Sequence, residues 1–149
     1  MIRGKTDFRA VRESVGMTQA ALAAELGVQV RSIKRWESPE APQQPPQDAW
    51  DVLVDAYEAQ ARAVAFAVDK AHELLAELPE GAEAEVCIPY WPDAAAYAAR
   101  STDSALGVAG DWRMANANAR AAAAILRSRG LEVRFADPAG PYAFLDRPI

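Results

Sequence analysis

The sequence has little of the residue types that most catalytic and metal sites require. It holds one cysteine, Cys87, and one histidine, His72. A single cysteine excludes an intramolecular disulfide and a cysteine-based metal cage, and a single histidine excludes a multi-histidine zinc site. No activated-nucleophile pattern surrounds His72, so we interpret it as a surface or interface residue. We therefore expect no enzymatic activity, no catalytic residues, no metal and no cofactor.

Long apolar runs are also missing. None approaches the roughly 18 residues that a membrane-spanning helix needs, and the first residues, MIRGKTDFRA, lack the apolar segment of a secretory signal. We expect a cytoplasmic protein without a membrane partner. Alanine is abundant instead, at 34 of 149 residues, and alanine favours helix over sheet.

The net charge of −5 conceals an uneven distribution. Residues 1–46 carry a net charge of +2, whereas residues 47–149 carry −7. The acidic part would repel phosphate, but the N-terminal part can approach it, since contact with DNA depends on the local potential. Because +2 is modest, tight binding to DNA would need several contacts per protomer or dimerisation.

Capping and breaking residues divide the chain into three segments. In the first, about 6–38, Thr18 can cap the helix QAALAAEL, Gly27 can end it, and a third helix follows at about 29–37. The proline-rich stretch SPEAPQQPP then breaks the helical pattern. We place a domain boundary near residue 60, which gives an N-terminal domain of residues 1–60 and an α/β domain of residues 61–149 that is led by a long helix and assigned to dimerisation.

The second segment, about 47–78, is a long helical pattern of one helix or two. Its apolar residues recur at alternating spacings of four and three, which predicts a continuous seam. The seam either packs within its own domain or pairs two protomers. Its members are Trp50, Val54, Tyr57, Ala61, Val64, Val68, Ala71, Leu75 and Leu78.

The third segment, about 82–149, predicts a β-α-α-β order. Strands are expected at 84–91 and 131–136, with helices at 93–100 and 111–129. A helical crossover within one sheet makes the strands parallel. Two strands alone are marginal in water, which suggests that a second protomer completes the sheet or covers its edge. The predicted fold class is mostly α, with an N-terminal bundle of short helices, a long helix and a small α/β part.

Aromatic residues are frequent in this third segment. We interpret them as core; the alternative is a small-molecule pocket or a protein-binding surface. They are Tyr90, Trp91, Tyr97, Trp112, Phe135, Tyr142 and Phe144.

The functional signal lies in MTQAALAAELGVQVRSIKRWE, residues 17–37. Ala23 is small where two crossing helices must approach closely. Five apolar residues are placed to face a shared core: Leu22, Leu26, Val28, Ile33 and Trp36. Four polar residues follow three- and four-residue steps on the opposite face of the third helix: Arg31, Lys34, Arg35 and Ser38. A helix with such a face fits the major groove of DNA.

The spacing of TQ, AxL, LGV, SI and RWE resembles the Cro/phage-repressor (XRE) helix-turn-helix family over roughly residues 6–60. The resemblance implies that residues 1–60 are a DNA-binding domain, a lambda-repressor-like helix-turn-helix bundle in which Gln19, Ser32 and Ser38 contact the DNA backbone. It also implies an ion pair between Arg12 and Glu37. The residues that it places in or near the groove are Gln29, Val30, Arg31, Lys34 and Arg35.

The WES ending, the long helix and the small α/β part also resemble repressors encoded beside anti-CRISPR genes. That resemblance implies a homodimer that binds an inverted-repeat DNA operator and represses its own operon. Two alternatives stay open. One is an antitoxin with a toxin-binding C-terminal half, and the other is a regulator that senses a small-molecule ligand of unknown identity.

Overall fold

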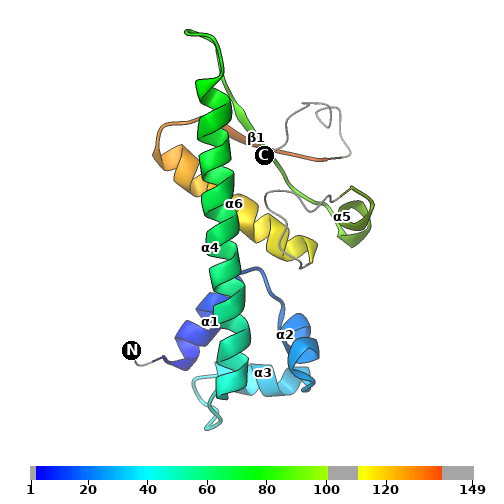
Figure 1. The fold of residues 1–149 in the computed structure, drawn as a ribbon. Helices are drawn as coiled ribbons and strands as arrows, with labels where there is room; N and C mark the ends of the chain where they lie inside the picture. Colours follow the sequence, from blue (N-terminus) through cyan, green and yellow to red (C-terminus); the bar gives the residue numbers. More distant parts are fainter. Residues whose placement is uncertain (1–2, 101–110, 139–149) are drawn as a thin grey trace. The chain divides into compact units, whose positions relative to one another are not determined.

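The computed structural model describes residues 3–100 and 111–138 of the chain. These residues form a mostly helical structure with one small sheet (Figure 1). The chain divides into two compact units, residues 1–59 and 60–149. The elements are α1 (Lys5–Ser14), α2 (Gln19–Leu26), α3 (Val30–Glu37), α4 (Gln47–Ala76), β1 (Val86–Pro89), α5 (Ala94–Arg100), α6 (Trp112–Ser128) and β2 (Val133–Ala136).

Local hydrogen bonds set both ends of α2. The Thr18 hydroxyl accepts a hydrogen bond from the Ala21 N–H at 3.0 Å and caps the start of the helix. Gly27 ends it in the left-handed conformation, with φ at 65°. The N–H of Val28 then donates to the Ala23 carbonyl at 3.0 Å, as in a Schellman motif. The resulting turn is short enough for α3 to begin at Val30.

The core of the first unit surrounds the ring of Phe8, which is fully buried. This ring meets Trp50 edge-on with centroids 5.1 Å apart and Trp36 edge-on at 6.3 Å. Leu22 and Ile33 are also fully buried, so α1, α2, α3 and the start of α4 share one core. The predicted core is therefore observed with one correction. Val28 is 36% exposed, because it follows the turn instead of lying on a helix face.

The long helical pattern forms the single helix α4. The alternative in which the whole seam packs within its own domain is wrong, because Tyr57 is 53% exposed, Ala61 is exposed, and Leu78, which follows the end of α4, is 44% exposed. The alternative in which the seam pairs two protomers stays a prediction. The physical reason is that α4 contributes to two separate cores. Its first turns bury residues in the first unit, and its later turns bury residues in the second. These residues are Ala49, Trp50 and Leu53 in the first, and Val64, Ala67, Val68 and Ala71 in the second.

In the second unit, β1 and β2 form a parallel pair. The register places Val86 opposite Val133 and Pro89 opposite Ala136. Val86 and Val133 are buried in a core that residues of α4 and α6 complete. The Asn116 side chain of α6 bonds both the N–H and the carbonyl of Trp91, at 2.8 and 2.9 Å. This side chain therefore satisfies the backbone just after β1.

Five of the predicted core aromatics, Tyr90, Trp91, Tyr97, Trp112 and Phe135, are half-buried, and four of them contact one another. Tyr90 and Phe135 pack with centroids 5.1 Å apart, and Trp91 meets Tyr97 edge-on at 5.3 Å. Trp112 lies under the guanidinium of the neighbouring Arg113. Two further aromatics of the predicted core, Tyr142 and Phe144, lie outside the described residues.

His72 is exposed, and its Nε2 atom lies 2.9 Å from Nη1 of Arg129. Cys87 is a half-buried free thiol on β1. Within residues 3–100 and 111–138, no cluster of three or more His, Cys, Asp or Glu side chains is placed to hold a metal ion. None of the helices described is both long and apolar enough to cross a membrane.

The left-handed turn makes Gly27 a test of this architecture. A Cβ there would meet no atom within 4 Å, so the cost of Gly27→Ala arises from backbone conformation alone. We expect the free energy of unfolding to fall by about 1–2 kcal/mol, measured by urea denaturation with tryptophan fluorescence. Gly27→Asn should lose less, because asparagine tolerates this conformation better. Equal losses in the two variants would contradict this account.

Candidate nucleic-acid interface

The helix α3 has one buried and one exposed face. Ile33 is fully buried, Glu37 is 9% exposed, and Trp36 is half-buried against the core of the first unit. On the other side, the side chains of Arg31, Lys34 and Arg35 are exposed. None of these three cations forms an ion pair with another residue that the structure describes. The exposed face of α3 is therefore free to meet an anionic partner.

Four further predicted contact residues lie at or near the two ends of α3. Gln29 is the N-cap, is exposed, and makes no capping hydrogen bond with its side chain. Val30 is 37% exposed. Ser32 is half-buried in the first turn, and its N–H donates to the Gln29 carbonyl at 2.9 Å. Ser38 is the half-buried C-cap, so it extends beyond the last turn of the helix.

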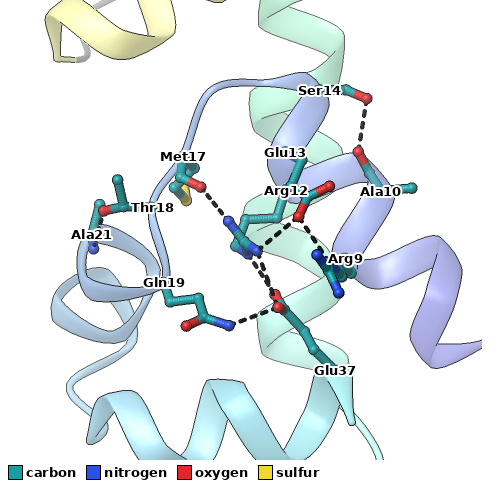
Figure 2. A network of polar contacts seen from close by, with 10 residues as sticks. All are labelled: Arg9, Ala10, Arg12, Glu13, Ser14, Met17, Thr18, Gln19, Ala21 and Glu37. Carbon is teal, nitrogen blue, oxygen red and sulfur yellow. Dashed lines mark hydrogen bonds and ion pairs between the residues drawn. The ribbon is translucent and has the colours of Figure 1, made fainter. Parts of the chain in front are cut away.

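An ion pair anchors the buried face. Arg12 of α1 donates from Nε to Oε1 of Glu37 and from Nη2 to Oε2, the latter at 3.0 Å (Figure 2). The two side chains are 9% and 5% exposed. Arg12 also donates from Nη1 to the Met17 carbonyl at 2.8 Å. This two-point geometry is the strong form of an arginine–carboxylate contact, and it joins α1, the following turn and α3.

Gln19 belongs to the same network. Its Nε2 donates to Oε2 of Glu37 at 2.8 Å, so the first residue of α2 is tied to the last residue of α3 (Figure 2). The side chain is half-buried. The structure thus brings Arg12, Gln19 and Glu37 together, whereas the residues of the exposed α3 face lie apart from this cluster.

Lys5 is a contributor that sequence reasoning missed. Its Nζ donates to the carbonyls of Arg35 at 3.0 Å and Ser38 at 2.8 Å, and also to that of Ala41. A cation at this point satisfies carbonyls at the C-terminal end of α3 and interacts favourably with the helix dipole. It also holds the start of the proline-rich loop. A lysine near the beginning of a chain carries no spacing signal that would have predicted this role.

A second ion pair on α1 is exposed. Arg9 donates to Oε1 of Glu13 at 2.8 Å. This hydrogen bond lowers the pKa of the Glu13 carboxyl below its ordinary value and raises the pKa of Arg9. The pair stabilises the fold above the ordinary carboxyl pKa, and that contribution is lost as the pH falls through the lowered value. Both side chains are solvated and screened by salt, so the contribution is small.

A family model for the Cro/C1-type helix-turn-helix matches residues 8–44. The match contains α2, α3, the turn between them and most of α1. It indicates a DNA-binding transcription regulator, in agreement with the cationic face of α3. The matched residues are 37 of the 149 in the chain. No curated protein sequence matches the chain.

The Lys5 contacts predict a measurable stability effect. Lys5→Met should lower the free energy of unfolding by about 1–3 kcal/mol, because hydrogen bonds from a charged donor are lost and carbonyls lose their partner. Urea denaturation followed by tryptophan fluorescence measures the change. Arg9→Met is the matched control, since it removes a cation of the same helix that makes only an exposed ion pair. Equal effects of the two substitutions would contradict a structural role for Lys5.

Proposed function

We propose that the protein is a homodimeric transcriptional repressor that binds an inverted-repeat operator through the major groove, with α3 as the recognition helix. The observation that carries the proposal is the two-sided character of α3. Its buried face is fixed by Ile33 and Glu37, and its exposed face carries three cations that form no ion pair with any residue of the described ranges, 3–100 and 111–138. A rigid helix of this kind can insert into the groove without rearrangement.

The exposed residues divide by the DNA groups that they suit. Arg31, Lys34 and Arg35 can pair with O6 and N7 of guanine. Gln29 suits adenine, and Val30 suits a thymine methyl group. These five residues are the proposed readers of base sequence.

Three further residues are proposed to contact the DNA backbone. Their amide or hydroxyl groups can donate to phosphate oxygens, which fixes the orientation of the protein without reading sequence. They are Gln19, Ser32 and Ser38.

Two arguments support a homodimer. The first 46 residues carry a net charge of only +2, so one copy has few cations with which to neutralise phosphates. The second unit contains a sheet of two strands within the described residues, and such a small sheet gains stability when a second copy completes it or covers its edge. We assign the pairing of protomers to residues 61–149. Two copies related by a two-fold axis would read an inverted repeat.

The role as a repressor, and as an autorepressor in particular, rests on the resemblance to repressors encoded beside anti-CRISPR genes. The DNA upstream of the gene is therefore the first sequence to examine. Footprinting on that DNA should protect two inverted half-sites about 10 bp apart, or a multiple of this, and overlapping the promoter. Protection of a single half-site, or of a site away from the promoter, would contradict the proposal.

Substitutions on α3 test the recognition helix. Arg31→Ala and Arg35→Ala should each weaken binding to the selected operator by about 1–3 kcal/mol if the side chain pairs with a base. Fluorescence anisotropy at fixed salt measures the change. Arg62→Ala is the matched control, because it removes an exposed arginine of α4 outside the matched region. Full affinity in both α3 variants would defeat the assignment.

The oligomeric state is a separate test. Sedimentation equilibrium should give twice the chain mass of 16.1 kDa, because we propose that two copies of the chain form a homodimer. A truncated chain of residues 1–59 should sediment as a monomer, since the proposed dimer contacts lie in the second unit. A monomeric full-length chain would overturn the dimer proposal and leave DNA binding by α3 intact.

A further inference from the structure

The carboxylate of Glu37 accepts one hydrogen bond in addition to the two from its ion-pair partner, Arg12. Arg12 alone supplies two hydrogen bonds, one to each oxygen. Oε2 accepts a further hydrogen bond, from Nε2 of Gln19 at 2.8 Å. The Glu37 side chain is 5% exposed, so this third contact is made in a largely dry environment, where hydrogen bonds are electrostatically strong. The contact therefore restrains the Gln19 side chain.

The restraint leaves part of the Gln19 amide available. An amide nitrogen carries two hydrogens, and one of them is used by Glu37. Figure 2 shows the amide oxygen of Gln19 directed away from Glu37. Among the described residues, the amide makes no other side-chain hydrogen bond. Gln19 is also half-buried at the first position of α2, so one N–H can reach an external acceptor.

The ion pair between Arg12 and Glu37 also determines the charge beside Gln19. An unpaired carboxylate beside Gln19 would repel a DNA phosphate. Arg12 balances the charge of Glu37 through the two-point contact. Nη2 of Arg12 also lies 3.7 Å from Oε1 of Glu13, but the closer Arg9 balances that carboxylate. A phosphate that approaches Gln19 therefore meets a neutral amide backed by a neutralised pair.

We propose that Glu37 is a positioning residue for DNA binding, which orients the Gln19 amide so that its free N–H donates to a backbone phosphate. Arg12 makes this possible by neutralising the carboxylate. The inference rests on the proposed function, and it assigns to Glu37 a role beyond joining α1 to α3. Holding a flexible glutamine in advance reduces the entropy lost when the contact forms.

Two matched double variants separate positioning from structural support. Arg12→Met with Glu37→Gln removes both charges and keeps an oxygen that can accept from Gln19. Arg12→Met with Glu37→Met removes both charges and the acceptor. Each variant loses the ion pair and the Met17 contact equally, so a purely structural role predicts the same DNA affinity for both. The probe is a short duplex of random sequence at low ionic strength, because a phosphate contact is independent of sequence.

We expect the variant that keeps the acceptor to bind this duplex as wild type does. The variant without the acceptor should bind about 3- to 10-fold more weakly, which corresponds to one hydrogen bond to a charged acceptor. Gln19→Ala should show the same loss, and adding it to the variant without the acceptor should cause no further loss. Circular dichroism and the urea midpoint check that the two double variants are equally folded.

A single substitution covers the case in which a double variant does not fold. Glu37→Asp keeps the negative charge but shortens the side chain by one methylene, so the carboxylate withdraws from Gln19 and from Arg12, which share its Oε2 atom. It should weaken binding to the random duplex as much as Gln19→Ala does. Wild-type affinity for this variant would contradict the positioning role.

The failures of the two proposals are distinguishable. Equal affinities of the two double variants would overturn the role of Glu37. Wild-type affinity of Gln19→Ala, with weakened operator binding by Arg31→Ala, would also overturn it and leave the recognition helix standing. Wild-type operator binding by both α3 arginine variants would remove the proposed function itself.

Discussion

A buried carboxylate at the end of α3 fixes the three helices of the first unit. Glu37 leaves water on folding, and a carboxylate does so at a high cost unless partners satisfy it. Those partners come from α1 and from the start of α2, as Arg12 and Gln19. These contacts tie the last turn of α3 to α1 and to the start of α2, while Arg31 and Arg35 lie on the exposed side of the helix.

The boundaries of α2 were predictable because local chemistry determines them. Thr18 caps α2 through its own hydroxyl, and Gly27 adopts the left-handed conformation that ends it. The buried positions of Leu22 and Ile33 follow from helical periodicity. Val28 was misplaced because its apolar character says nothing about whether a residue lies on a helix or in the turn after it. The apolar pattern thus predicts burial within a helix better than burial next to a turn.

Contacts between residues far apart in the chain were harder to predict from the sequence. Arg12 and Glu37 lie 25 residues apart, and only the family resemblance, not spacing, placed them together. Lys5 bonds the carbonyls of residues 30 and more positions away, and nothing distinguishes it from a solvated lysine. The seam of α4 is not buried within one chain at Tyr57 and Ala61, because a regular apolar repeat does not reveal that one helix contributes to two cores.

Pro89 on β1 carries a consequence for self-association. The N–H groups of Val86 and Tyr90 point to β2, so by alternation the nitrogen of Pro89 faces the outer edge, where it has no hydrogen to donate. The next outward groups, those of Trp91, are occupied by Asn116. A foreign strand therefore finds few backbone partners along this edge. The β1 edge is therefore protected against the edge-to-edge growth by which exposed strands aggregate, and a second copy that completes the sheet would have to pair with β2.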